Sequence, residues 1–142
     1  MEALVHRTIG CCIAVHRALG PGLLEGIYRR AICIELNAAG ILFECEKAIP
    51  VIYRGEFLCE HRLDFVVGGA LILEVKSVEH LVPVHDSQLL NYMRIAHIRV
   101  GLLMNFNVVV LQDGIKRRIC DLMFLFVFSC FCGSGRVPSS VI

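Results

Sequence analysis

The chain has 142 residues, of which 56% are hydrophobic and 19% are charged. This composition excludes an intrinsically disordered chain and is enough for one domain with a substantial core, but not comfortably for two. The formal net charge of +1 excludes a broad basic surface, so any contact with nucleic acid would depend on local basic patches.

The eight cysteines indicate a reduced compartment rather than a metal or disulfide framework. None forms a CxxC pair, and Cys130-x-Cys132 has no His or Cys partner at zinc-finger spacing. The N-terminus carries Glu2, His6 and Arg7 and lacks the apolar core of a signal peptide. We therefore expect a cytoplasmic protein whose cysteines act mostly as small buried hydrophobic residues.

The first part of the chain predicts two helices. Residues 2–19 carry an apolar stripe that includes His16, which we interpret as a core-edge histidine satisfied by a hydrogen bond rather than as a catalytic residue. Gly20-Pro21-Gly22 ends this helix, and a second helix follows over about 23–39. The predicted buried face of the second helix consists of Leu24, Ile27, Ala31, Ile34 and Ala38.

From residue 41 the apolar pattern changes to a period of two, which is typical of strands. Residues 43–49, 51–53 and 57–59 are strand-like, with Pro50 at an edge or kink and Arg54-Gly55 in a turn. A third helix is predicted over 83–97 and a fully buried strand over 100–104. The order of helix, helix, three or four strands, helix and strand predicts an α/β or α+β fold with a mixed sheet.

The most informative segment is a predicted hairpin around Gly68-Gly69, because it carries Asp64, Glu74 and Lys76 on otherwise apolar strands. A carboxylate and an ammonium are costly to bury without partners. A two-residue turn would place Asp64 and Glu74 on opposite faces of the sheet. We therefore expect a three-residue loop over 67–69, with Gly69 in the left-handed conformation.

This register assigns every hairpin side chain to one of two faces. The first face would hold Asp64, Ile72, Glu74 and Lys76. The second would hold the core residues Phe65, Val67, Leu71, Leu73 and Val75. Two close carboxylates repel each other, so without metal one carboxyl of the Asp64/Glu74 pair should have a raised pKa, less so if Lys76 compensates.

Gly22-Leu23-Leu24-Glu25-Gly26-Ile27-Tyr28 resembles the signature of the GxxExxY protein family, which is grouped within the PD-(D/E)XK nuclease superfamily. The resemblance runs over about 9–119 and covers most of the chain. Its further parts are Val15-His16-Arg17-Ala18-Leu19-Gly20-Pro21-Gly22, the Asp64 strand, Glu74-Val75-Lys76, Pro83-Val84-His85, Gln88-Leu89-Leu90-Asn91-Tyr92 and Gly101-Leu102-Leu103-Met104-Asn105-Phe106.

The resemblance implies a restriction-endonuclease-like core of helix, three strands, helix and strand, with a magnesium-dependent phosphodiesterase site. Asp64 and Glu74 match the metal-binding acids, and Lys76 matches the superfamily lysine. Gln88 matches a glutamine that some branches place beside the site. Glu25 matches a helix acid that approaches the metal directly or through water. The other family-motif positions are Gly22, Tyr28, His16 and His85.

Two departures from the superfamily pattern stand out. Leu63 occupies the position of the proline in the superfamily name. The segment after Asp121 has no counterpart, so we divide the chain into one nuclease-like domain over 1–121 and an apolar extension over 122–142. Residues 122–132 carry no charge, but eleven residues are too few for a membrane-spanning helix, which needs about 20.

Three interpretations are open at this point. The first is a nuclease that uses Mg²⁺, or Mn²⁺, on DNA or RNA. Its basic patches are modest, at Arg29-Arg30, Arg94 with Arg99, and 116–118, so a homodimer or a protein partner could be needed for binding. The second is a nuclease-fold binding or regulatory module without turnover. The third is an exposed Glu74–Lys76 salt bridge with no further role. No membrane partner is expected.

Overall fold

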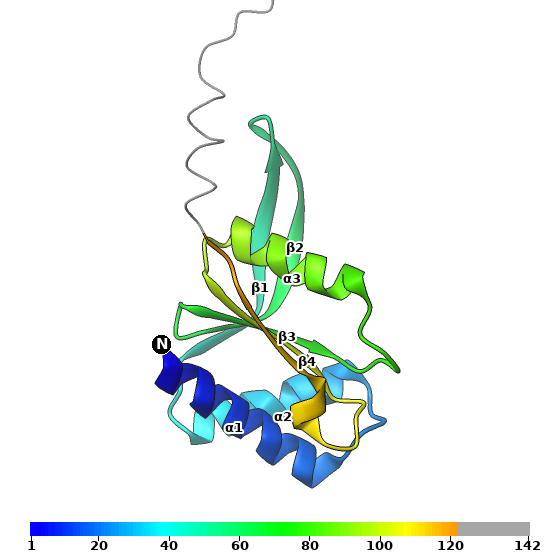
Figure 1. Cartoon of the computed structure of the whole chain (residues 1–142). Helices are drawn as coiled ribbons and strands as arrows, with labels where there is room; N and C mark the ends of the chain where they lie inside the picture. Colours follow the sequence, from blue (N-terminus) through cyan, green and yellow to red (C-terminus); the bar gives the residue numbers. More distant parts are fainter. Residues whose placement is uncertain (122–142) are drawn as a thin grey trace, which may run out of the picture.

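The computed structural model describes residues 1–121; the predicted C-terminal extension, 122–142, lies outside the described residues. Three helices, five strands and one short 3₁₀ turn make up this part of the chain (Figure 1). In chain order they are α1 (Glu2–Leu19), α2 (Glu25–Ala38), β1 (Phe43–Tyr53), β2 (Glu56–Val67), β3 (Leu71–Lys76), α3 (Pro83–Ile95), β4 (Val100–Asn105), η1 (Leu111–Gly114) and β5 (Ile115–Ile119).

The strands form one mixed sheet in the order β1-β2-β3-β4-β5. Among the five strands of residues 1–121, β3 and β4 run parallel, joined by α3 as a crossover, and the other neighbouring pairs are antiparallel. The mixed sheet and the element order confirm the predicted fold class. The sequence pattern does not predict β5, because Lys116, Arg117 and Arg118 interrupt the apolar alternation of this edge strand.

The sheet lies between two helical layers (Figure 1). One face packs against α1 and α2 around a core that includes the predicted hairpin residues Phe65, Val67, Leu71, Leu73 and Val75. The opposite face packs against α3 through a second cluster, to which Leu63, Val66 and Ile72 contribute. Leu63 is fully buried there, so an apolar side chain serves the core at the position of the superfamily proline.

The hairpin has the expected odd-numbered loop, but one residue later than predicted. Val67 pairs with Leu71, so the loop is Gly68-Gly69-Ala70 rather than 67–69. The Ala70 N–H donates to the Val67 carbonyl at 3.1 Å, and both glycines have positive φ (57° and 66°), which a side chain would disfavour. The shift changes the pairing but keeps Asp64 and Glu74 on one face.

The β1–β2 hairpin extends beyond the sheet as a two-stranded arm (Figure 1). Its strands pair as far as Tyr53 and Glu56, with a register shift between Val51 and Ile52 and the predicted turn at Arg54-Gly55. Pro50 lies on β1, an edge strand, where a missing backbone N–H is tolerated. The arm is therefore much longer than the three short strand segments that the sequence indicated.

The predicted buried face of α2 is wrong. Tyr28, Ile32 and Leu36, spaced by four residues, are the fully buried side chains, whereas Leu24 and Ile34 are 77% and 69% exposed. Both sets satisfy helical periodicity, so the pattern alone did not select between them. Docking against α1 and the sheet selected the stripe that carries the large aromatic ring.

The cysteines follow the expectation only in part. Cys11, Cys12 and Cys120 are buried, but Cys45 and Cys59 are exposed on the arm strands, and the six cysteines of the described residues are all free thiols. Within residues 1–121, no helix has the length and apolar character needed to cross a bilayer.

Candidate active site

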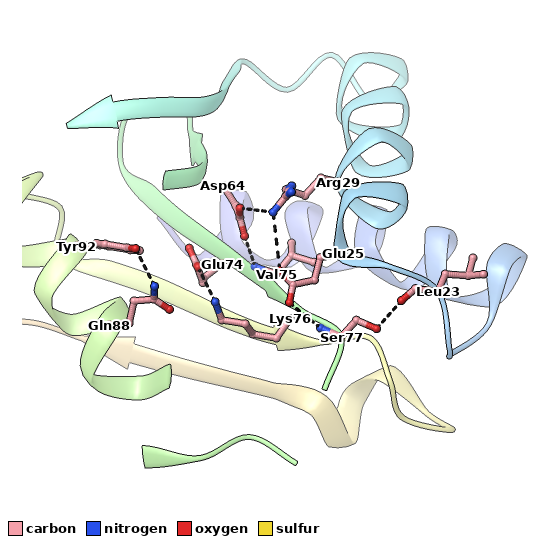
Figure 2. Close-up of polar contacts among 10 residues, drawn as sticks. All are labelled: Leu23, Glu25, Arg29, Asp64, Glu74, Val75, Lys76, Ser77, Gln88 and Tyr92. Atoms are coloured by element: carbon pink, nitrogen blue, oxygen red, sulfur yellow. Dashed lines mark hydrogen bonds and ion pairs between the residues drawn. The ribbon is translucent and has the colours of Figure 1, made fainter. Parts of the chain in front are cut away.

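The candidate site lies where β2 separates from β3. The last residue pair of the ladder between these strands is Phe65 and Leu73. Asp64 is the residue of β2 immediately beyond this pair. Asp64 Oδ2 accepts a hydrogen bond from the Val75 N–H at 2.8 Å, and Asp64 Oδ1 accepts one from Arg29 at 2.9 Å (Figure 2). The Asp64 carboxylate therefore accepts the hydrogen bond of the Val75 N–H in place of a backbone carbonyl of β2, and it bridges the two strands where they separate.

Glu74 lies on β3, one pair beyond the end of the ladder and opposite Asp64. Its Oε1 accepts a hydrogen bond from the Lys76 ammonium at 3.0 Å, and the two side chains are only 5% and 13% exposed. Glu74 Oε2 is buried and has no hydrogen-bond partner within the described part of the chain. The pair is thus a buried ion pair with one unsatisfied oxygen, which rules out the exposed salt bridge of the third interpretation.

The acidic pair has strongly perturbed protonation. Burial, and then the negative charge of Asp64, raise the pKa of Glu74 to about 7, while Lys76 opposes the rise. Burial also raises the pKa of Asp64, against the lowering effect of the Val75 N–H and Arg29. Both carboxyls have a raised pKa, where one was expected, and desolvation contributes more to the rise than the repulsion between the acids.

Glu25 lies at the start of α2, which the structure places over the end of β3. Its Oε2 accepts a hydrogen bond from the Ser77 N–H at 3.3 Å, and Ser77 Oγ donates to the Leu23 carbonyl at 2.6 Å (Figure 2). Arg29, one turn further along α2, lies 3.9 Å from Glu25. These contacts tie the first turn of α2 to the strand that carries Glu74 and Lys76.

Two other positions of the heptapeptide signature have structural roles. The fully buried Tyr28 donates a hydrogen bond to the Gly20 carbonyl at 2.6 Å and accepts one from the Leu23 N–H at 3.1 Å. Its ring stacks on Phe106 with 4.5 Å between centroids. Gly22 has φ +93° within this loop, a conformation that side chains rarely adopt. Together they shape the loop that positions Glu25.

Two of the remaining predicted residues, Gln88 and His85, lie beside the site on α3. Gln88 lines a pocket together with Lys76 and donates a hydrogen bond to the Tyr92 hydroxyl at 2.8 Å (Figure 2). His85 lines the same pocket, and its Nδ1 accepts from the Val82 N–H at 3.2 Å, which caps α3.

His16 is not part of this group. It is buried on α1, with Nε2 2.8 Å from the Val108 carbonyl, as expected for a core-edge histidine.

Arg29 is a site residue that the sequence pattern does not reveal. It was noted only as part of a basic patch, yet its guanidinium forms the 2.9 Å ion pair with Asp64. The available signal was its position four residues after Glu25, which places both side chains on one face of α2. Helical spacing did not reveal that this face turns towards β2.

The donor set fits a hard divalent cation. Among residues 1–121, no three or more His, Cys, Asp or Glu side chains converge closely enough to form a cage of protein ligands. Mg²⁺ does not require one, because it keeps several waters and usually takes one or two carboxylates. The unsatisfied Glu74 Oε2, buried beside Asp64, is the kind of oxygen that such a cation would satisfy.

A mixed sheet between helices, with an acid on one strand where its ladder with the next strand ends, and an acid and a lysine on that next strand, defines a restriction-endonuclease-like α/β protein. The chain belongs to the PD-(D/E)XK nuclease superfamily, whose family model matches residues 2–118. Membership indicates a nuclease-type function, and these nucleases generally use divalent metals. Comparison with curated proteins and with solved structures finds no match.

Proposed function

We propose that the protein is a metal-dependent phosphodiesterase that cleaves nucleic acid in the cytoplasm. Asp64 and Glu74 hold Mg²⁺, or Mn²⁺ in its place, and Lys76 assists. Glu25 contributes through a water molecule, since its own carboxylate is engaged by Ser77. The observation that carries the proposal is the buried Glu74 Oε2, which has no hydrogen-bond partner among the described residues and lies near a second carboxylate.

Asp64 and Lys76 have different roles in the proposed reaction. When bound, a divalent metal lowers the pKa of the attacking water and stabilises the negative charge that develops on the phosphate. Asp64 is held rigidly by Val75, so one metal ligand is oriented before binding. Lys76 now pairs with Glu74; if that carboxylate held a cation, the ammonium would be available to neutralise charge on the phosphoryl oxygens.

The first experiment measures melting temperature with and without metal. We expect Mg²⁺ or Mn²⁺ to raise it by several degrees, because a ligand at about 100 times its Kd adds about 2.7 kcal/mol to the free energy of unfolding. Asp64→Asn or Asp64→Ala should abolish this rise. Glu60→Ala removes an exposed acid from the same strand and should keep it.

The same proteins are then incubated with labelled single-stranded and duplex DNA and RNA. Metal-dependent cleavage by the parent protein, lost in Asp64→Asn and Lys76→Met, supports the phosphodiesterase. The absence of a melting shift in saturating metal would contradict the metal site itself.

A second candidate function is a nuclease-fold binding or regulatory module that does not turn over. The observation that favours it is Arg29, which neutralises Asp64 at 2.9 Å and so competes with a cation for that carboxylate. A melting shift without cleavage of any nucleic acid supports this candidate. In that case Arg29→Met should increase the metal-dependent shift.

A further inference from the structure

A pocket of about 780 Å³ lies beside the candidate active site, between α3 and the β1–β2 arm. Lys76 lines it and also pairs with Glu74, so the pocket and the acidic pair share a side chain. Gln88, Asn91 and Tyr92 reach it from α3, and His61 reaches it from the arm. We call it the α3–arm pocket.

The α3–arm pocket is positively biased in a chain that is nearly neutral overall. Lys76 and Arg94 contribute formal charges, His61 and His85 contribute imidazoles, and none of its described lining residues is Asp or Glu. The whole chain, by contrast, has 13 acidic and 14 basic residues. A concave site lined by one sign of charge concentrates ligands of the opposite sign, such as phosphodiesters.

The pocket also carries groups that recognise bases. The His61 and Tyr92 rings lie 5.6 Å apart at 52°, with His61 on the exposed side. Gln88 and Asn91, on the same face of α3, present amides that can donate to and accept from a base edge. The volume lies within the range of small-molecule sites and exceeds what a phosphate alone requires.

These features select between forms of nucleic acid. In a duplex each base is paired and stacked, so its Watson–Crick edge and its faces are not available to a pocket. Unpaired bases can turn out, stack on aromatic side chains and bond to amides. Resting on the proposed function, we propose that the α3–arm pocket binds a nucleotide of a single strand, with its base near His61 and Tyr92 and its phosphate towards Lys76.

The test is fluorescence anisotropy in EDTA, which separates binding from cleavage. The probes are labelled oligo-dT and oligo-U of about 12 nucleotides and a labelled DNA duplex of the same length. We expect either single strand to bind at least about tenfold more tightly than the duplex. His61→Ala should weaken single-strand binding by about fivefold or more, the scale of one lost base–ring contact.

Arg94→Ala should weaken single-strand binding by a similar factor, through lost phosphate attraction. Arg17→Ala is the matched control, because it removes an exposed arginine from α1, in the opposite helical layer, and should change the affinity by less than about twofold. His61 and Arg94 are both exposed, and thermal melts check that their variants remain folded.

Equal or tighter binding of the duplex, or unchanged single-strand binding by both variants, would overturn the pocket assignment. Such a result would leave the proposed phosphodiesterase intact, since the metal-induced melting shift and its loss in Asp64→Asn are measured without nucleic acid. Oligo-U and oligo-dT differ in the 2′-hydroxyl and in the C5-methyl group of the base, and a preference for either one supports a single-strand pocket.

Discussion

Glu74 combines three features that rarely occur together in a side chain with only a structural role. Its side chain is 5% exposed, it lies near a second carboxylate, and one of its oxygens has no hydrogen-bond partner within residues 1–121. An ionised carboxylate in such a place is destabilising unless it is paired. Lys76 supplies one partner, and the second position suits a cation.

The raised pKa of Glu74 predicts how stability depends on pH in metal-free protein. Its pKa is about 7 when folded and near 4.5 when unfolded, so between these values the folded state holds more protons. The free energy of unfolding should therefore fall as pH rises through this window, by at most roughly 3 kcal/mol. The raised pKa of Asp64 acts with the same sign.

Urea denaturation at several values between about pH 4 and 8 measures this dependence. Glu74→Gln should flatten the curve, because the titrating group is gone. Glu60→Gln, an exposed acid on β2, should leave the slope unchanged. A slope that is the same in Glu74→Gln and in the parent would show that other groups control the pH dependence.

Among the elements, α2 positions the site through its first turn. Glu25 and Arg29 face the strands, while Tyr28 points into the core and bonds to the loop that precedes the helix. Glu25, the first residue of α2, is therefore positioned both by the Tyr28-bonded loop that precedes it and by its hydrogen bond from Ser77 after β3. The signature heptapeptide combines one residue directed to the site with two that shape the loop.

Tyr28→Phe tests the contribution of this loop. The substitution keeps the ring on Phe106 but removes partners from the Gly20 carbonyl and the Leu23 N–H. We expect a loss of about 1–3 kcal/mol in the free energy of unfolding, since both groups are partly buried. Ile34→Ala, on the exposed side of the same helix, should change it by less than about 0.5 kcal/mol.

Denaturant titration of both variants gives the comparison, and the metal-induced melting shift of Tyr28→Phe reports on the position of Glu25. Equal stabilities of the two variants would mean that the loop is held by other contacts.

In the whole molecule, α3 approaches the sheet closely because β4 has a glycine beneath it. A Cβ built on Gly101 would lie 2.6 Å from Met93 Sδ and 2.9 Å from Leu89 Cδ1. The same helix carries Gln88 and Tyr92, so the height of α3 above the sheet sets one wall of the α3–arm pocket.

Gly101→Val should therefore destabilise the protein by about 1–3 kcal/mol through overpacking, and weaken single-strand binding as α3 moves outward. Gly10→Ala is the control in α1, where a Cβ meets no atom within 4 Å, and should stabilise by about 0.5–1 kcal/mol. Thermal melts and anisotropy report the two effects. Unchanged stability of Gly101→Val would show that Met93 and Leu89 reorient without cost.

The amino-acid sequence was sufficient for the elements whose evidence is local. The period of two along the hairpin assigned Phe65, Leu73 and Val75 to the core, because alternation is imposed by the backbone of any strand. The same parity placed Asp64 and Glu74 on one face, even though the loop begins one residue later than predicted. Glycine and proline signals gave the end of α1 and the start of α3, whereas α2 begins later and α3 ends earlier than predicted.

Only the tertiary structure decided which surfaces meet. Two stripes of α2 have equal periodicity, and packing chose the one with Tyr28. The ion pair between Arg29 and Asp64 joins residues 35 positions apart, and the α3–arm pocket joins β1, β2, β3 and α3. Such contacts depend on the register and separation of distant segments, which hydrophobic periodicity does not encode because it reports only on the local backbone.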